Sequence, residues 1–251
     1  MKNGILLRSA KNYLFLDTEH GVLESSGSSI KLHELPIINP GDTLFYRGEE
    51  YTAIDGNHSY SVYARSRRTQ IMQPWDIAFF VDLCNIGSES RVLESGLGTG
   101  NLSRIILSRL GEKGQLVTVE KSPEIIDSYR SSHESVDRRW SIVNADIEQA
   151  QLDGMFNAVL LDIPEPWKAV SNIDSHLVPG SFFCSYVPTF NQLEKIYLKL
   201  EESGYEIIET SRLLREPILV RRDATRPDNR IIGHTGFICA GVRKSGFVVQ
   251  I

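Results

Sequence analysis

The sequence has little cysteine and no long hydrophobic run. Its three cysteines, Cys84, Cys184 and Cys239, lie far apart and form no CxxC pair. This spacing argues against a zinc site and against a disulfide framework, so we expect no metal and a reducing, cytoplasmic environment. No stretch of 18 or more apolar residues occurs, and the opening MKNGILLRSAKNY has too short an apolar segment for a signal peptide. We therefore expect no membrane partner.

The chain also lacks an excess of positive charge. Its formal net charge is −5 at pH 7, which by itself disfavours a nucleic-acid binder, because such proteins usually show a basic surface. With 251 residues, 41% hydrophobic and 24% charged, the composition is that of a globular protein with one substantial core and room for a small second one. Any nucleic-acid surface must therefore come from a local basic patch.

The first part of the chain has the pattern of a small β domain. Residues 1–56 contain short extended runs such as YLFLD, TLFY and YTAI, separated by turn signals such as TEHG and RGEE. We place a β-rich domain at residues 1–62 and a second domain at residues 63–251.

The second part alternates between strand and helix from about residue 91. Strand patterns RVLES, QLVTVE, WSIVNA, FNAVLLD and SFFCSYV are interleaved with helical patterns such as NLSRIILSRL, PEIIDSYRSS and FNQLEKIYLKLEES. This alternation indicates a parallel α/β sheet, with Phe79–Leu83 in a helix before the first strand. YEIIETSRLL and HTGFICAGVRK follow without a helix between them, so we expect an antiparallel pair at one edge. Seven strands of this kind outline the class I S-adenosylmethionine-dependent methyltransferase fold, a Rossmann-like sheet.

A glycine loop follows the first strand of this part. In ESGLGTGN (94–101), Gly96, Gly98 and Gly100 have the spacing GxGxG, whereas a dinucleotide fold prefers GxGxxG. Glu94 precedes the first glycine by two residues and can help orient groups near a methionine ammonium. The pattern suits S-adenosylmethionine, which has no phosphate and which glycines allow the backbone to approach closely. The plain alternative is a tight strand-to-helix turn that needs glycine only for positive φ.

Two further acids lie at strand ends. Glu120 ends QLVTVE, where a carboxylate can take both ribose hydroxyls, and Asp146 ends IVNAD, where one can accept from the adenine amino group. Either acid alone is more simply explained as a helix N-cap, since Asp146 precedes IEQAQL. Together they favour a ligand crevice along that edge of the sheet.

Five segments carry a family resemblance. RRTQIMQPWDIAFF (67–80), ESGLGTGNLS (94–103), LLDIPEPWKA (160–169), CSYVPTFNQL (184–193) and GHTGFICAGVRK (233–244) resemble, in the same order, the tRNA (adenine-N1)-methyltransferases. The resemblance covers about residues 60–244. The glycine loop is generic to methyltransferases, and the RTQI and LDIPxPW segments are more specific. The family methylates T-loop adenine, chiefly at position 58, has a small N-terminal β domain, and in prokaryotes is usually a homotetramer, so the resemblance implies tRNA and self as partners.

The resemblance also implies roles for matching residues. The methionine part of S-adenosylmethionine is expected near Met72, Thr99, Gly100 and Asn101, the ribose at Glu120, and the adenine between Asp146 and Ile147. Asp162 matches the catalytic acid and also borders the cofactor, and Tyr186 matches an aromatic position beside the substrate base.

One residue departs from the family pattern. Where the family often has Tyr or His, this chain has Gln73, which cannot stack on the target adenine equally well. Archaeal members can methylate two adjacent adenines, and the sequence leaves open whether one or both are taken here.

The segment LLDIPEPW has a chemical rationale in this reaction. N1 of adenine is a weak nucleophile and becomes cationic on methylation, while the donor is already an activated sulfonium, so catalysis consists of positioning and charge stabilisation. A carboxylate at Asp162, hydrogen-bonded to the adenine N6 amino group, serves both purposes. Pro164 and Pro166 stop the sheet and form a rigid turn, which Trp167 packs against the core. The alternative is that Asp162 caps a helix.

The target adenine must leave its stack to be methylated. Tyr186 is the candidate stacking surface for the extruded base, and the alternative is a tyrosine at a strand end with its hydroxyl in water.

Basic side chains gather in two places. Residues 212–230 hold six arginines against three acids, and Arg65, Arg67 and Arg68 form a second cluster. We expect RNA contacts at Arg65, Arg68, Arg221 and Arg222, because the arginine fork suits phosphate. For Arg221 and Arg222 a subunit interface remains equally open.

Three other functions compete with tRNA methylation. A non-catalytic tRNA-binding subunit predicts a degraded glycine loop or a missing acid, yet ESGLGTG and Asp162 are intact. A methyltransferase for a protein, such as one acting on isoaspartyl groups, or for a small molecule leaves RTQI and LDIPEPW unexplained. An NAD-dependent oxidoreductase is disfavoured by GxGxG.

Overall fold

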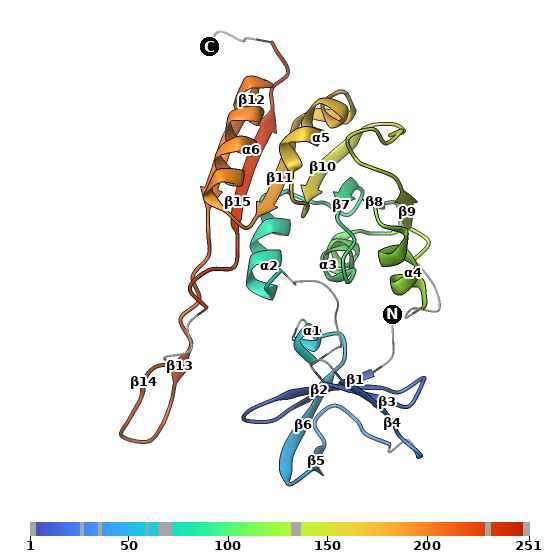
Figure 1. Ribbon diagram of the computed structural model, residues 1–251, viewed down its shortest axis with the longest axis vertical. Coiled ribbons are helices and arrows are strands. Elements are labelled where there is room, and N and C mark those ends of the chain that lie inside the picture. Colours follow the sequence, from blue (N-terminus) through green and yellow to red (C-terminus); the bar gives the residue numbers. More distant parts are fainter. Residues whose placement is uncertain are drawn as a thin grey trace. The chain divides into compact units, whose positions relative to one another are not determined.

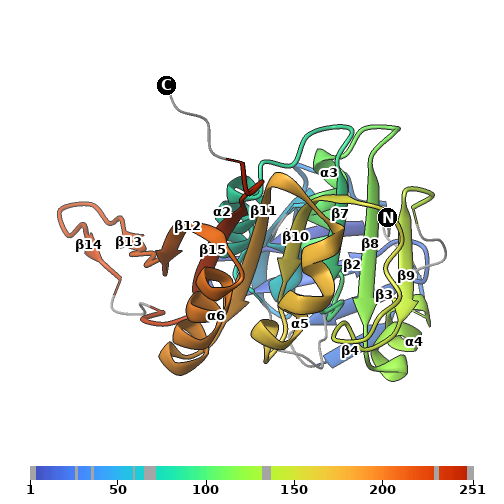
Figure 2. The same ribbon diagram turned by 90° about the horizontal axis from the view of Figure 1, so that it is seen from above.

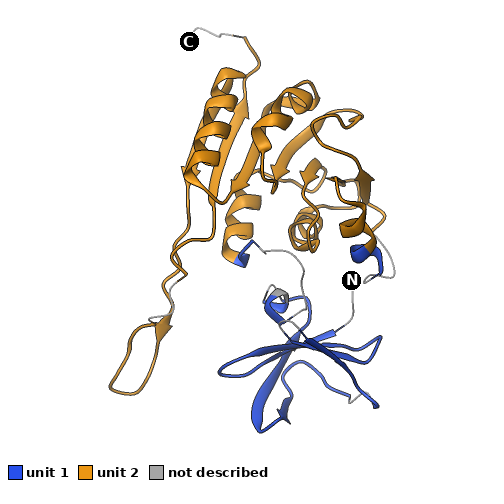
Figure 3. Cartoon of the chain, viewed as in Figure 1, with its two compact units in different colours: residues 1–74, 128–136 blue, residues 75–127, 137–251 orange. Residues whose placement is uncertain are grey.

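The chain folds into two compact units. The computed structural model describes residues 4–25, 28–34, 37–58, 60–64, 72–131, 137–228 and 232–247. One unit comprises residues 1–74 with 128–136, and the other residues 75–127 with 137–251 (Figure 3). The structure thus divides the chain after Pro74, and the domain boundary expected after residue 62 stays a prediction.

The first unit is the expected small β domain. Its six strands pair antiparallel in the order β4-β3-β2-β1-β6-β5. They are β1 (Gly4–Arg8), β2 (Tyr13–Asp17), β3 (Val22–Ser25), β4 (Ser28–Lys31), β5 (Thr43–Tyr46) and β6 (Glu49–Asp55). Alternate residues of each strand point to opposite faces, so Leu7 and Leu14 bury one face while Leu6 and Phe15 pack with Ala64 of α1 (Ser61–Ala64) on the other.

The second unit contains the predicted seven-stranded sheet. The strand order is β12-β15-β11-β10-β7-β8-β9 (Figure 1). The strands are β7 (Arg91–Ser95), β8 (Gln115–Glu120), β9 (Trp140–Asn144), β10 (Phe156–Leu161), β11 (Leu177–Val187), β12 (Tyr205–Ser211) and β15 (Phe237–Arg243). β7 to β11 are mutually parallel where they pair, and β15 runs antiparallel to both of its neighbours. The antiparallel pair is confirmed, with the last strand inserted between β11 and β12.

Helices cover both faces of this sheet. α5 (Pro166–Ile173) and α6 (Phe190–Glu202) lie on one face, and α2 (Pro74–Leu83) and α3 (Asn101–Arg109) lie on the other (Figure 2). α4 (Pro123–Ser131) follows β8, and a short hairpin of β13 (Ile218–Leu219) and β14 (Arg226–Pro227) follows β12. The helix expected at Phe79–Leu83 is confirmed as part of α2. Among the described residues, none of the helices is long and apolar enough to span a bilayer.

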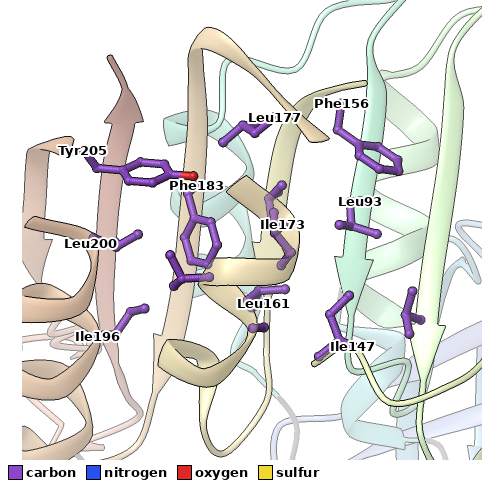
Figure 4. Packing of buried hydrophobic residues seen from close by; sticks show 14 of the residues in the cluster. Leu93, Ile147, Phe156, Leu161, Ile173, Leu177, Phe183, Ile196, Leu200 and Tyr205 are labelled. Atoms are coloured by element: carbon purple, nitrogen blue, oxygen red, sulfur yellow. The ribbon is translucent and has the colours of Figure 1, made fainter. Parts of the chain in front are cut away.

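The main core lies between the sheet and α5 with α6. Phe183 of β11 and Leu161 of β10 pack there against Ile173 and Leu200 of the two helices (Figure 4). Because helices cover both faces, the central strands are apolar on both sides and form continuous hydrophobic runs in the sequence.

The strand order reverses between β10 and β7. β7 is the first strand of this sheet, and it pairs with β10 on one side and with β8 on the other. In open α/β sheets, ligands bind beyond the carboxyl ends of the strands at such a reversal. The residues after Ser95 and after Leu161 therefore flank the expected ligand site.

Phe183 tests the core. Phe183→Ala should lower the free energy of unfolding by about 3–5 kcal/mol, because loss of the fully buried ring leaves a cavity. Phe247, with 87% of its surface exposed, supplies the control, and Phe247→Ala should change it by less than about 0.5 kcal/mol. Urea denaturation measures both, and equal effects would contradict this account of the core.

Candidate active site

The glycine loop is packed directly against the segment that follows β10. Gly96, Gly98 and Gly100 all have positive φ, at 97°, 50° and 73°. A Cβ built on Gly96 would lie 2.2 Å from the carbonyl oxygen of Asp162, and the Asp162 amide donates to Ser95 O at 2.9 Å. All three positions thus have the positive φ that favours glycine, as the alternative of a tight turn also predicts. At Gly96 there is a second requirement, a close approach to the chain's own backbone, which the sequence did not reveal.

Glu94 is a fully buried carboxylate beside this loop. Its Oε2 accepts hydrogen bonds from Ser103 at 2.6 Å and Thr118 at 2.5 Å, and Trp140 Nε1 donates to the Thr118 hydroxyl at 2.7 Å. Burial raises the pKa of Glu94 to about 7, helped by the charges of Asp162 and Glu120. Its Oε1 has no hydrogen-bond partner among the described residues. Glu94 therefore offers a buried acceptor to a ligand that carries positive charge or N–H groups.

Glu120 holds the loop in place. Its Oε2 accepts from the Leu97 amide and its Oε1 from the Ser122 amide, each at 2.9 Å. Each carboxylate oxygen keeps a second lone pair, so these bonds are compatible with the ribose contact, which stays a prediction.

Asp146 and Ile147 lie after β9. Asp146 pairs with Lys121 Nζ at 2.6 Å, and this hydrogen bond lowers the pKa of the carboxyl. Residues 147–149 form a turn, so the alternative of a helix N-cap at Asp146 is wrong. Ile147 is buried in the main core, and Asn172 Nδ2 donates to its carbonyl at 2.9 Å. Their contact with the cofactor adenine stays a prediction.

The remaining predicted cofactor residues have varied surroundings. Thr99 is exposed, and Asn101, the first residue of α3, accepts at Oδ1 from Arg104 at 3.2 Å. Met72 is buried and belongs to the first unit. In the same unit, the Tyr63 hydroxyl donates to Gln73 Oε1, a pairing that the sequence did not indicate. The roles of these residues toward the cofactor stay predictions.

Asp162 follows directly after β10 and is not a helix cap. The residue before α5 is Glu165, whose side chain makes no capping hydrogen bond, so that alternative is wrong. Asp162 has exposed surface, yet the surrounding protein excludes enough water from its carboxyl to raise the pKa to about 6. The charge of Asp162 also helps to raise the pKa of Glu94, which places the two acids near one another.

The turn that carries Asp162 is bonded and packed to neighbouring elements. Pro164 O accepts from Gln192 Nε2 of α6 at 2.8 Å, and α5 begins at Pro166. Trp167 packs on the main core, with Lys195 Nζ 4.9 Å from its ring centroid. The packing role predicted for Trp167 is confirmed.

Tyr186 is buried, with only 7% of its surface exposed. Its hydroxyl donates to Asp76 Oδ2 at 3.0 Å, its ring lies edge-on to Phe80 with centroids 6.3 Å apart, and a Cβ on Gly236 would lie 2.3 Å from the ring. Burial raises the pKa of Tyr186 and also that of Asp76. The alternative of a hydroxyl in water is wrong, and stacking on the target base stays a prediction. No pattern in the sequence indicated that Asp76 fixes this tyrosine.

The arginine patches are partly described. Arg65, Arg67 and Arg68 lie outside the described residues. Arg221 and Arg222 are exposed in the loop between β13 and β14, and Arg215 lies over the ring of Trp75, 5.1 Å from its centroid.

Gly96 tests the packing of the loop. Gly96→Ala should cost more than about 2 kcal/mol of unfolding free energy and weaken S-adenosylmethionine binding, because its Cβ would meet Asp162 O. Gly180 also has positive φ, at 84°, but has open space around it, so Gly180→Ala should cost only about 1 kcal/mol and leave binding intact. Denaturation and calorimetric titration compare the two, and a similar loss in both would mean that backbone conformation alone matters.

Curated proteins and solved structures resemble this chain along most of its length. The tRNA (adenine(57)-N(1)/adenine(58)-N(1))-methyltransferase TrmI of Methanocaldococcus jannaschii is 25% identical over 246 residues, covering 86% of this chain and 87% of the relative. The tRNA (adenine(58)-N(1))-methyltransferase TrmI of Thermus thermophilus is 25% identical over 240 residues, covering 93% of each.

Two solved structures support the fold. A SAM-dependent O-methyltransferase from Thermotoga maritima superposes with a TM-score of 0.84 at 22% identity, covering 99% of this chain and 95% of that one. The tRNA (m1A58) methyltransferase TrmI from Aquifex aeolicus gives 0.78 at 22% identity, covering 96% of each. Both show that the fold is that of the S-adenosylmethionine-dependent methyltransferases.

A match to a family model identifies the family of this chain. The family model is described as the tRNA methyltransferase complex GCD14 subunit, and it matches residues 61–235, more than half of the chain. This range holds the glycine loop, the Asp162 turn and Tyr186 with its partner Asp76. The chain therefore belongs to the GCD14 family of tRNA methyltransferase subunits.

Proposed function

We propose that this protein transfers a methyl group from S-adenosylmethionine to N1 of an adenine in the T-loop of tRNA, at position 58 or at both 57 and 58. The observation that carries the proposal is the place of Asp162. It stands at the carboxyl end of β10, at the reversal of strand order, with its backbone against Gly96 of the glycine loop. Family membership and the names of the two curated relatives support the substrate.

The negative charge of the site favours S-adenosylmethionine as the cofactor. Three carboxylates, Glu94, Glu120 and Asp162, lie close enough for the other two to raise the pKa of Glu94. S-adenosylmethionine carries sulfonium and ammonium charges against a single carboxylate, so it offsets this repulsion, and it supplies an activated methyl group. Glu94, the glycine loop from Gly96 to Asn101, and Glu120 would hold it, with Met72, Asp146 and Ile147 as further contacts. A dinucleotide would place its pyrophosphate among these acids, which disfavours an NAD-dependent enzyme.

Asp162 acts on the methyl acceptor, the adenine ring. Its carboxylate accepts from the adenine N6 amino group, which fixes the ring so that N1 faces the methyl group. It also stabilises the positive charge that develops on the ring. The carboxylate must be ionised to do both, and with a pKa of about 6 it is mostly ionised above pH 7.

Tyr186 and Asp76 shape the base pocket in this proposal. Asp76 anchors the Tyr186 hydroxyl, which fixes the ring at the end of β11 as a wall beside the target base. Burial of the ring limits its stacking surface to what the pocket exposes.

The loop around the β13–β14 hairpin would serve RNA and assembly together. Arg221 and Arg222 are exposed there, next to the exposed apolar side chains of Leu214, Ile218 and Val220. We infer that the arginines contact tRNA phosphates, with Arg65 and Arg68, and that the apolar side chains are covered in a homotetramer. We propose a cytoplasmic location, which is consistent with a tRNA substrate.

The other functions fit less well. The intact glycine loop and the desolvated Asp162 argue against a non-catalytic subunit. The likeness to an O-methyltransferase shows the fold only, and the family match favours tRNA over a protein or small molecule.

The proposal is tested with unmodified tRNA transcript and S-adenosylmethionine. Digestion and mass spectrometry should show 1-methyladenosine, and reverse-transcription stops should map it to position 58 or to both 57 and 58. Asp162→Asn should lower kcat by about 10²–10³ while cofactor binding persists. If the wild-type protein binds the cofactor but methylates no nucleoside, the substrate or a required partner has been misassigned.

Asp162→Asn should also distinguish a catalytic role of the acid from a role in folding. The pKa of Asp162, about 6, lies above its ordinary 3.8, so the folded state binds the extra proton between these values and stability falls as the pH rises across this range. Asp162→Asn should therefore unfold no earlier than the wild type at pH 8. Loss of folding or of cofactor binding in this variant would make the acid structural.

Cofactor binding should release protons near neutral pH. The pKa of Glu94 is about 7 and that of Asp162 about 6, and a cationic ligand lowers both because it favours the ionised forms. Titration calorimetry at a pH between these two values, in buffers of different ionisation enthalpy, should show proton release with S-adenosylmethionine. S-adenosylhomocysteine, which lacks the sulfonium charge, should release fewer protons. Equal release, or proton uptake, would contradict a cofactor site beside Glu94 and Asp162.

A further inference from the structure

The first unit contains a cavity that the methyl-transfer site does not use. Its volume is about 530 Å³, within the range of pockets that hold small ligands. All of its lining residues belong to the first unit, and they include Lys11, Tyr13, Tyr46, Arg47, Glu49 and Tyr51.

Curvature of the six-stranded sheet creates this cavity. β4 and β5 stand at opposite ends of the strand order, yet Ile30 of β4 and Tyr46 of β5 line the same space. The sheet therefore bends so that its two ends approach one another. The buried side chains of Leu14, Leu23 and Tyr51 belong to the apolar core of the unit, and polar side chains supply most of the remaining lining.

Glu49 is a fixed acceptor in this cavity. Its Oε2 accepts from Ser9 at 3.2 Å and from the Tyr51 hydroxyl at 3.3 Å, and its Oε1 pairs with Lys11 Nζ at 3.2 Å. The hydrogen bond from Lys11 is the main cause that lowers the pKa of Glu49, so the carboxylate is ionised at neutral pH. The side chain keeps 27% of its surface exposed, and Oε1 retains a lone pair for one further N–H donor.

Arg47, beside this acceptor, has a backbone conformation that is unusual for arginine. It occupies the two-residue turn between Tyr46 and Glu49 with φ at 49°, followed by Gly48 at 78°. Positive φ at both positions favours Asn, Asp or Gly over arginine. The guanidinium lies over the Tyr46 ring, 5.3 Å from its centroid. This contact holds the guanidinium at the cavity, whose lining includes both side chains.

We propose that this cavity binds one unstacked nucleotide of the tRNA, with its base among the tyrosine rings, its exocyclic amino group on Glu49 and its phosphate on Arg47. The inference rests on the proposed function for the identity of the RNA. Tyrosine faces stack on any base, an ionised carboxylate accepts from the exocyclic amino group that only some bases carry, and arginine binds phosphate. With Glu24 and Glu49 against Lys11 and Arg47, the lining is electrically balanced, which favours a base with one phosphate over a run of phosphates.

Arg47→Gly separates RNA binding from folding. Glycine relieves the positive φ, so the variant should unfold no earlier than the wild type. Its Kd for tRNA should rise about tenfold, while kcat at saturating tRNA and the Kd for S-adenosylmethionine stay unchanged. Asn85→Gly is the matched control, because Asn85 has the same φ of 49° in the second unit and should leave tRNA binding unaltered. An unchanged Kd in Arg47→Gly would overturn the proposal.

Glu49→Gln tests the base preference. Short oligoadenylate should compete with labelled tRNA for the wild-type protein better than oligouridylate, because uracil lacks an amino group. The amide introduced by this substitution can donate to uracil as well as accept from adenine, so the variant should lose the preference. An equal preference in both proteins would overturn the role of Glu49.

The two proposals fail in different ways. If the proposed function is wrong, the wild-type protein methylates no tRNA. If only this inference is wrong, the wild-type protein and Arg47→Gly methylate tRNA with the same KM.

Discussion

The contact between Gly96 and the backbone of Asp162 is the constraint on which the site depends. A side chain at residue 96 would lie 2.2 Å from Asp162 O, so only glycine lets the loop after β7 lie flat against the turn after β10. The Asp162 amide, bonded to Ser95 O, continues the pairing of the two strands beyond their ends. This contact places the glycine loop and the acid side by side at the point where the strand order reverses.

Charge is the second organising feature of this site. Folding brings Glu94, Glu120 and Asp162 together in partly desolvated surroundings, which raises the pKa of Glu94 and Asp162 and costs stability at neutral pH. In the proposed function, a cationic methyl donor and a substrate ring that becomes cationic would both reduce this repulsion. The proposed activity would thus relieve a repulsion that folding creates, as expected for an active site.

The first unit differs from the second in its core and in its proposed role. Its sheet is too small for a large core, and its curvature leaves a cavity with an apolar floor and polar lining. In the proposals above, the second unit recognises cofactor and target atom through carboxylates, while the first offers aromatic rings, one fixed carboxylate and a strained arginine. Chemistry on a single adenine and recognition of a larger RNA would therefore have separate structural bases.

The class of the fold could be predicted from sequence patterns, and so could the strand ends at which the candidate site residues stand. The alternation of strand and helix, the GxGxG loop and the acid of LLDIPEPW are local patterns, and local patterns specify elements and the ends of strands. Which side chains meet became clear from the folded chain alone. Tyr186 binds Asp76 across 110 residues, Lys121 pairs with Asp146, and Ser103 and Thr118 hold Glu94. Such pairs depend on strand register and on helix packing between distant segments, which no local pattern encodes.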